Sequence, residues 1–190
     1  MKKLLALTLA LVFCFALASC SEQKADAQYV KMTIKDFGTV VIELRPDQAP
    51  ITCDNFIKLV SDGFYDGLTF HRVIDDLLIQ GGDPEGNGTG GPGYSIKGEF
   101  TANGVDNKLS HTRGAVSMAR SSLPNSAGSQ FFFVLRDYTY WDGSYAVFGY
   151  VVEGMDVLDK IGDVSCDSSD KPLTDVVIEK AELLESYKAE

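Results

Sequence analysis

The feature that most limits the fold of this chain is a series of short β-rich runs, bounded by glycine, aspartate or asparagine. The first two runs are separated by Asp36-Phe37-Gly38, as in an antiparallel hairpin. Many short strands without a long alternation of strands and helices predict an all-β barrel or sandwich. The predicted strands are Tyr29–Lys35, Thr39–Leu44, Leu68–Ile74, Val116–Ala119, Gln130–Leu135, Ala146–Val151 and Thr174–Glu179.

Two other segments carry apolar residues at helical spacing. The first follows Pro50 and ends at Gly63, and the second runs from Glu153 to Ile161. Proline at the start of a helix and glycine at its end are typical boundaries. The sequence therefore predicts two short helices packed on a β-structure.

The N-terminus has the pattern of an export signal. Lys2 and Lys3 precede an apolar run from Leu4 to Leu17, which is shorter than the roughly 20 apolar residues that a membrane-spanning helix needs. The run ends in Leu17-Ala18-Ser19-Cys20, which resembles the bacterial lipobox, whose cysteine is lipidated and becomes the first mature residue. The alternative is an ordinary cleavage site at which Cys20 is incidental.

We therefore expect residues 1–19 to be a lipoprotein signal peptide and 20–28 to be the lipidated cysteine with a polar tether. Residues 29–186 would form one folded domain, and 187–190 a polar tail. The tether that follows Cys20 reaches at most about 29 Å when fully extended. The domain would then lie close to a cell membrane or cell envelope, outside the cytoplasm.

The charge of the chain excludes one class of partner. Loss of residues 1–19 removes two of the 17 basic residues and none of the 27 acidic ones, so the formal net charge changes from −10 to −12. Such a surface repels nucleic-acid phosphates and anionic lipid headgroups. Nucleic acid is therefore not an expected partner, and membrane attachment would depend on the lipid at Cys20.

Two cysteines lie in the predicted domain, Cys53 and Cys166. Thiols outside the cytoplasm can pair, but sequence spacing does not show whether the two Cα atoms come within bridging distance. A disulfide and two unpaired thiols both remain open, and we favour the unpaired thiols.

The remaining motifs give little support to metal or nucleotide chemistry. The stretch Gly81–Gly93 lacks the Lys-Ser/Thr ending of a phosphate-binding loop and does not open a helix, so we interpret it as a structural or substrate-lining loop. His71 and His111 are the only histidines, and no zinc or acyl-transfer motif accompanies them. We expect both to be structural hydrogen-bonding residues, and we expect no metal or organic cofactor.

Polar side chains inside aromatic, β-rich runs indicate a candidate site. Arg72 and Gln80 lie among phenylalanine and leucine residues. An arginine in such a run is unusual unless it forms an ion pair or has a role in binding or catalysis. An apolar pocket with a few polar groups is the ordinary form of a binding site. The pattern alone fits equally well an arginine that lies across the outer surface of a barrel.

Longer motifs separate these alternatives. FHRVI, QGGDP, SMAR, PNSAGSQFF, WDG and VFG follow one another in this order between Phe70 and Gly149. In this order they resemble the cyclophilins, and the resemblance extends over about residues 29–185. It implies a closed eight-stranded antiparallel β-barrel capped by two α-helices, with the activity of a peptidyl-prolyl cis-trans isomerase.

The resemblance also implies a role for each matching residue. Arg72 matches the catalytic arginine of the family, and Gln80 matches the glutamine that supports it. The proline pocket and peptide groove would comprise Phe70, Leu77, Leu78, Ala119, Arg120, Ser121, Gln130, Phe132, Tyr140, Trp141 and Tyr145.

Several of these residues depart from the family pattern. Leu77 and Leu78 stand where many cyclophilins have Phe and Met, and Tyr145 stands where others have His. Tyr140 falls at the position of the pocket-rim tryptophan, and Trp141 follows it. Adjacent strand residues face opposite sides, so Trp141 is not expected to replace the rim tryptophan, and the resemblance implies weak cyclosporin binding.

The function implied by the resemblance is rotation about X–Pro bonds in exported proteins that are still folding. The expected partners are proline-containing peptide segments and, through Cys20, a membrane; we expect a monomer. One alternative is a proline-peptide-binding chaperone or assembly module with little turnover. Another is a lipocalin-like barrel with a small apolar ligand, which a barrel interior filled by side chains would exclude.

Overall fold

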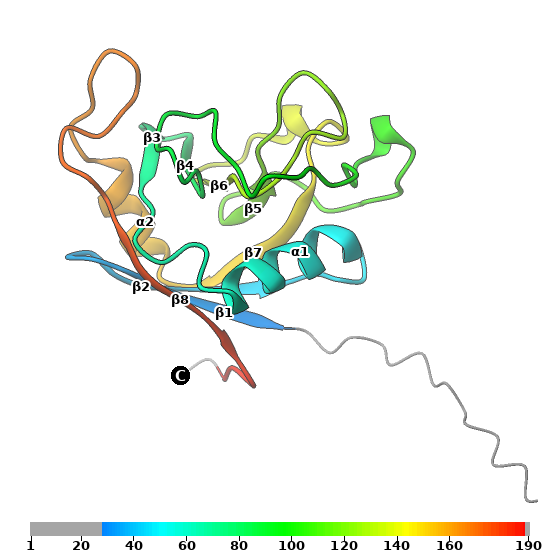
Figure 1. The fold of residues 1–190 in the computed structure, drawn as a ribbon, viewed down its shortest axis with the longest axis horizontal. Coiled ribbons are helices and arrows are strands. Elements are labelled where there is room, and N and C mark those ends of the chain that lie inside the picture. Colours follow the sequence, from blue (N-terminus) through cyan, green and yellow to red (C-terminus); the bar gives the residue numbers. More distant parts are fainter. Residues whose placement is uncertain (1–27, 189–190) are drawn as a thin grey trace, which may run out of the picture.

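The computed structural model describes residues 28–188, so the predicted signal peptide, Cys20 and the tether up to residue 27 lie outside the described residues. Eight strands, two α-helices and two short 3₁₀ helices follow one another in this part of the chain (Figure 1). The elements are β1 (Tyr29–Ile34), β2 (Gly38–Leu44), α1 (Pro50–Ser61), β3 (Phe70–Ile74), β4 (Leu78–Gly81), η1 (Thr101–Asn103), β5 (Ala115–Met118), β6 (Phe131–Val134), η2 (Thr139–Trp141), β7 (Val147–Glu153), α2 (Met155–Gly162) and β8 (Ile178–Leu184).

The eight strands form one antiparallel sheet in the order β3-β4-β6-β5-β7-β2-β1-β8. The two helices cover different parts of the sheet: α1 contacts β8, and α2 contacts β2, β3 and β4 (Figure 1). Within residues 28–188, no helix has the length and apolar character needed to cross a membrane. The prediction of an antiparallel β-structure with two helices is confirmed.

The sheet is an open half-barrel, so the prediction of a closed barrel is wrong. Its two edges, β3 and β8, are connected by one isolated bridge, between Thr69 and Val177. Further along β3, the backbone N–H of Val73 donates to the carbonyl oxygen of Asp170 at 2.8 Å. The irregular segment 170–177 therefore flanks β3, because β8 begins only after this segment and runs along β1.

Two strands differ from the sequence prediction. The pattern gives no separate strand at Leu78–Gly81, where β4 forms, because β4 is defined by its pairing with β3 and β6, which the local sequence does not show. The last strand is Ile178–Leu184 rather than Thr174–Glu179. Only Ile178 and Ala181 of this strand are buried. The sequence does not show the pairing with β1, and without that pairing so few apolar positions are typical of a polar tail.

Side chains along β6 alternate between two clusters. Phe131 and Phe133 belong to the main hydrophobic core, whereas Phe132 and Val134 belong to a second apolar cluster. Successive strand residues point to opposite faces of a sheet, so one strand contributes to both clusters. The second cluster also contains Leu78 of β4, and it forms the base of the site described below.

Aromatic rings fill the main core. The ring of Phe56 in α1 lies 5.0 Å from that of Phe148 and 5.3 Å, edge to face, from that of Phe131. Tyr65 is fully buried beside them and donates from its hydroxyl to the carbonyl oxygen of Ser129 at 3.0 Å. Ring packing of this kind fixes α1 on the sheet. An interior filled by side chains also argues against a lipocalin-like ligand cavity.

Both cysteines of the described chain are free, which confirms the interpretation as unpaired thiols. Cys53 is buried in α1, and its sulfur lies 3.4 Å from the carbonyl oxygen of Phe148. Burial raises the pKa of the Cys53 thiol to about 12. The thiol is therefore protonated and unreactive at neutral pH.

A buried carboxylate from a distant loop caps the N-terminus of α1. Ala49, at the N-cap position, makes no side-chain hydrogen bond. Instead the carboxylate of Glu99, which is 2% exposed, accepts from the backbone N–H of Ile51 at 3.1 Å and of Thr52 at 2.7 Å. It also accepts from the Thr52 hydroxyl at 2.7 Å. N–H groups of the first turn have no partner inside the helix, so Glu99 fixes α1 to the loop before η1.

We expect Glu99→Ala to lower the free energy of unfolding by about 2–3 kcal/mol, because it leaves buried donors of α1 without an acceptor. The matched control is Glu182→Ala, whose carboxylate pairs with Lys31 at 3.2 Å on the surface and should cost less than about 1 kcal/mol. Urea unfolding of both variants measures the difference. Equally small effects would contradict the capping role of Glu99.

Candidate active site

A β-bulge in β3 sets the direction of the candidate catalytic arginine. Phe70 pairs with Gly81 and Arg72 pairs with Gln80, so His71 is the extra residue on β3. A bulge interrupts the alternation of side chains and re-aims those that follow it. Phe70 stays in the main core, and Arg72 is exposed directly across from Gln80.

The Arg72 guanidinium is partly exposed and weakly held. Its Nε lies 3.5 Å from a carboxylate oxygen of Asp170, and 44% of each of the two side chains is exposed. Surface ion pairs of this kind contribute only about 0–1 kcal/mol to stability. The guanidinium has five N–H donors, so it keeps donors for a further partner.

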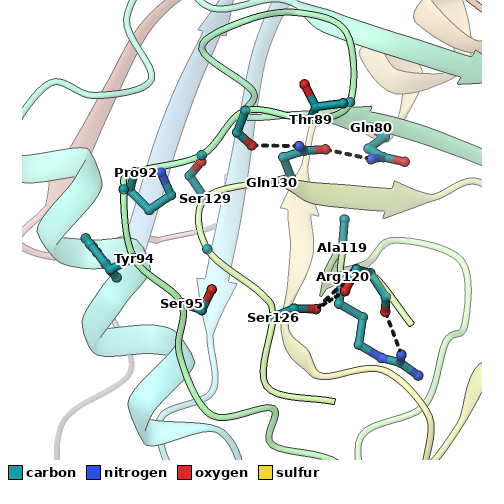
Figure 2. A pocket seen from close by; sticks show the side chains of 16 residues that line it. Gln80, Thr89, Pro92, Tyr94, Ser95, Ala119, Arg120, Ser126, Ser129 and Gln130 are labelled. Atoms are coloured by element: carbon teal, nitrogen blue, oxygen red, sulfur yellow. Dashed lines mark hydrogen bonds between the residues drawn. The ribbon is translucent and has the colours of Figure 1, made fainter. Parts of the chain in front are cut away.

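Gln80 is held in a short chain of hydrogen bonds (Figure 2). Its Nε2 donates to Oε1 of Gln130 at 2.9 Å, and Nε2 of Gln130 donates to the carbonyl oxygen of Gly90 at 2.9 Å. Gln130 thus fixes the orientation of the Gln80 amide and connects β4 to the glycine-rich loop.

A small hollow of about 210 Å³ lies beside Arg72; we call it the Phe132 hollow. Phe132 is 4% exposed and Leu78 is 5% exposed, so both present only a small apolar surface to it. The rings of Trp141 and Tyr145 lie 5.5 Å and 6.1 Å from that of Phe132. The hollow therefore combines an aromatic and aliphatic wall with a guanidinium. Its lining residues are Arg72, Leu78, Gln80, Ala119, Arg120, Phe132, Trp141 and Tyr145.

Arg120 connects two walls of the Phe132 hollow. Its Nε and Nη2 donate to the carbonyl oxygen of Ser144 at 3.0 and 2.8 Å, and its Nη1 donates to that of Ser121 at 2.9 Å. The guanidinium also lies over the ring of Tyr145, 4.6 Å from the ring centroid. Because these donors are already used, Arg120 fixes the shape of the hollow, and Arg72 is the guanidinium that can serve a ligand.

A second hollow, of about 440 Å³, is shown in Figure 2; we call it the Gln130 hollow. The glycine-rich loop contributes to its lining, together with Ser121 and Gln130. The Gln130 hollow adjoins the Phe132 hollow, with which it shares Gln80, Ala119 and Arg120. An extended peptide that lies in one hollow can therefore continue into the other, as expected if part of Gly81–Gly93 is a substrate-lining loop.

Three of the predicted site residues lie outside these hollows. Phe70 is 1% exposed and packs in the main core, with its ring 6.2 Å from that of Phe131, because it precedes the bulge. Tyr140 is 87% exposed on η2. Leu77 packs against the second apolar cluster without lining the Phe132 hollow.

Trp141, in contrast, lines the Phe132 hollow. Tyr140 and Trp141 belong to a 3₁₀ helix rather than a strand, so the rule that neighbours face opposite sides does not apply to them. The indole lies beside the rings of Phe132 and Tyr145. The argument for weak cyclosporin binding assumed that no indole lines the pocket, and this assumption is wrong.

Sequence reasoning missed a buried hydrogen-bond network beside Phe132. Nδ1 of His111 lies 2.7 Å from Oδ1 of Asp142, and Nε2 lies 3.1 Å from Oγ of Ser117. The imidazole stacks with the ring of Phe132 at 6.1 Å between centroids. The prediction that His111 is a structural hydrogen-bonding residue is confirmed. Its partners come from separate segments of the chain, so no local sequence signal indicates the network.

The protonation state of this network follows from burial. Burial lowers the pKa of His111, although the hydrogen bond with Asp142 acts to raise it. For Asp142, burial acts to raise the pKa, but hydrogen bonds from Ser110 and His111 outweigh this effect and lower it. A neutral His111 ring then donates from Nδ1 to the Asp142 carboxylate and accepts the Ser117 hydroxyl at Nε2.

His71 does not behave like His111. It is 7% exposed, and neither of its ring nitrogens has a hydrogen-bond partner within residues 28–188. Burial lowers its pKa, although the nearby Asp83 carboxylate acts to raise it. The prediction that His71 is a structural hydrogen-bonding residue is therefore wrong.

Comparisons with known proteins place this geometry in a family context. The model of the family described as "Cyclophilin type peptidyl-prolyl cis-trans isomerase/CLD" matches residues 29–183. Peptidyl-prolyl cis-trans isomerase ppi1 of Schizosaccharomyces pombe is 45% identical over 145 residues, which are 76% of this chain and 92% of the relative. Peptidyl-prolyl cis-trans isomerase-like 1 of Neurospora crassa is 45% identical over 148 residues, 77% of this chain and 89% of the relative.

A solved structure is also similar. It is the crystal structure of a Cryptosporidium parvum cyclophilin-type peptidyl-prolyl cis-trans isomerase in the presence of the dipeptide Ala-Pro. It matches with a TM-score of 0.77 and 32% sequence identity, and the match covers 84% of this chain and 100% of that chain.

The two buried histidines predict that the protein is less stable in mild acid. His71 and His111 both have pKa values below the ordinary 6.5 in the folded protein, so the unfolded chain binds more protons as the pH falls through 6.5. We expect the free energy of unfolding, measured in urea, to decrease from about pH 7.5 to about pH 5.5. His111→Gln should reduce this decrease. A free energy that rises on acidification would contradict the argument.

Proposed function

The chain belongs to the family of cyclophilin-type peptidyl-prolyl cis-trans isomerases, and we propose that it works outside the cytoplasm, anchored to a membrane by a lipid on Cys20. Its substrates would be X–Pro bonds of exported proteins that are still folding. The chemistry of such bonds defines what the site must do.

Rotation about an X–Pro bond requires no covalent bond to be made or broken. Its barrier of about 18–20 kcal/mol comes from amide resonance, and uncatalysed exchange takes roughly tens to hundreds of seconds. A catalyst must favour the twisted amide, in which the prolyl nitrogen regains a lone pair. A donor that meets this nitrogen only in the twisted state stabilises the transition state more than the ground state.

One observation carries the assignment of this mechanism: Arg72 lines a hollow that has an aromatic and aliphatic wall and a size suited to a single ring. The Phe132 hollow measures about 210 Å³, less than the roughly 300–1,000 Å³ of sites for drug-sized ligands. Phe132, Leu78 and Tyr145 would hold the pyrrolidine ring, while Gln80 holds the peptide. Arg72 would then donate to the prolyl nitrogen as resonance is lost.

The proposed location depends on the N-terminal segment. The ending Leu17-Ala18-Ser19-Cys20 supports lipidation of Cys20, and the tether of residues 21–28 supports a domain held within about 29 Å of the membrane. Proteins that fold outside the cytoplasm can be limited in rate by X–Pro isomerisation. The acidic composition supports attachment through lipid rather than through anionic headgroups. We propose that the domain acts as a monomer.

We expect Arg72→Ala to lower kcat/KM for a short X–Pro peptide by about 10²–10³-fold, as loss of a preorganised transition-state donor does. The melting temperature should stay unchanged, because the ion pair with Asp170 is exposed. Arg72→Lys keeps the charge without the planar fork and should recover only part of the activity. A peptide isomerisation assay and a thermal melt on the same purified variants provide both measurements.

The matched control for Arg72 is Arg136→Ala. Arg136 also makes a partly exposed surface pair, with Asp76 at 3.7 Å, and it lines none of the hollows described above. Near-normal turnover in a folded Arg72→Ala protein would refute the mechanism. A wild-type protein that binds proline peptides but hardly turns them over would favour the chaperone or assembly module instead.

We expect Cys20→Ala to release the protein from the membrane fraction, because the mature domain would lose its lipid. Fractionation of cells that export the wild-type and variant chains measures the change, and Cys53→Ala serves as the cysteine control. A Cys20→Ala protein that stays bound to membranes would show that the lipoprotein proposal is wrong.

A further inference from the structure

A third hollow, of about 480 Å³, adjoins the Phe132 hollow; we call it the His71 hollow. It shares Arg72 and Gln80 with the Phe132 hollow, and its other walls come from the glycine-rich loop and from segment 167–171. The isomerisation mechanism above gives no task to His71 or to the side chains of this segment.

His71 is the unexplained group of this hollow. It is 93% buried, and neither ring nitrogen finds a hydrogen-bond partner in the part of the chain that the structure describes. Burial of a polar group without a partner is costly, and such a group in a folded protein requires an explanation. As the bulged residue of β3, His71 lines the hollow. A hydrogen bond to a substrate group would provide the explanation, provided that the imidazole, whose ring nitrogens expose almost no surface, turns toward the hollow when the ligand binds.

The charged side chains that line this hollow favour an anion. Among the lining residues, Arg72 and Lys171 contribute two cations against one carboxylate, that of Asp167. Arg72 is also paired with Asp170, which does not line the hollow, so Lys171 is the cation on which the argument depends. Oδ1 of Asp167 already accepts from the backbone N–H of Ser169 at 2.7 Å and of Lys171 at 3.1 Å. Among residues 28–188, no ion pair engages the Lys171 ammonium. Lys171 is therefore a cation available to a ligand.

A second carboxylate near His71, that of Asp83, is directed into the glycine-rich loop. It is 1% exposed, and its oxygens accept from the backbone N–H groups of Glu85, Asn87 and Gly88. Hydrogen bonds to a carboxylate stabilise its charge locally. The Asp83 carboxylate therefore repels an anion in the hollow less strongly than a carboxylate without hydrogen bonds would.

We propose that the His71 hollow binds the carboxylate of an aspartate or glutamate that flanks the substrate proline. Lys171 provides the opposite charge, and the neutral ring of His71 donates one N–H to a carboxylate oxygen. A neutral amide could accept the same hydrogen bond but would gain nothing from the charge of Lys171. The inference rests on the isomerase function and names the class of substrate that the enzyme prefers.

The position of the acidic residue follows from how the hollows adjoin. Gln80 lines the Phe132 hollow, the His71 hollow and the Gln130 hollow. With proline in the Phe132 hollow, we expect one flank of the peptide to enter the Gln130 hollow and the other flank to enter the His71 hollow. The acidic residue therefore matters on one side of the proline only.

The test uses pairs of short X–Pro peptides that carry either glutamate or glutamine at one position before or after the proline. The members of a pair differ in charge and little in shape. Isomerisation assays give kcat and KM, and the fluorescence of Trp141, the only tryptophan of the chain, gives Kd independently of turnover. We expect an about five- to tenfold preference for glutamate on one flank, expressed in KM and Kd, that weakens at about 1 M salt.

Two variants assign this preference to the hollow. Lys171→Gln should bring the glutamate-to-glutamine ratio close to one, whereas Lys108→Gln, on an exposed lysine paired with Asp106, should leave the ratio unchanged. His71→Leu should reduce the ratio to about twofold without lowering the melting temperature, since it removes a buried polar group that has no partner. A lower melting temperature with an unchanged ratio would show that His71 is structural.

The outcomes separate this inference from the isomerase function. If the peptides are turned over but the ratio is near one at every position, or if the preference survives in Lys171→Gln, the inference is overturned and the isomerase function stands. If no peptide is turned over while Kd retains a preference for glutamate that depends on Lys171, the His71 hollow is supported and the proposed catalytic function fails.

Discussion

Alternation along β6 is the constraint on which both the core and the site depend. The rings of Phe131 and Phe133 contact each other in the core, and Phe131 also contacts Phe56. Phe132, which lies between them in the strand, must therefore point to the opposite face. A slip of one residue would exchange the base of the site with the core. The packing energy of the core therefore also keeps Phe132 in position, which is the rigidity that a preorganised site requires.

Arg72 has a different kind of support. It follows a bulge on a strand at the edge of the sheet, and its guanidinium is held only by an exposed ion pair. Phe132 and Leu78, in contrast, are nearly buried in the second apolar cluster. The site thus combines a fixed apolar base with an adjustable donor. This combination suits a reaction in which one part of the substrate turns while the other stays in place.

Much of the fold and part of the site could be predicted from the sequence, because alternating β-rich runs indicate most strands and long motifs identify Arg72, Gln80 and Phe132. The errors have physical causes that a sequence does not show. The prediction for Phe70 ignores the bulge, and the order of Tyr140 and Trp141 is set by a 3₁₀ helix rather than a strand. Other features depend on contacts between segments that are distant in the sequence, and local patterns do not encode such contacts. These features are the open edge of the sheet, the cap of α1 and the network of buried polar groups around His111.

The open edge of the sheet at β3 affects the dynamics of the site. A regular ladder secures β3 only on its β4 side, and segment 170–177 secures the other side at isolated points. Backbone amides at such an edge exchange with solvent through local openings that leave the core intact. Because Arg72 lies on β3, the same openings displace its guanidinium from the Phe132 hollow. We therefore expect turnover to be coupled to a subglobal opening equilibrium, so that two variants with equal melting temperatures can differ in rate.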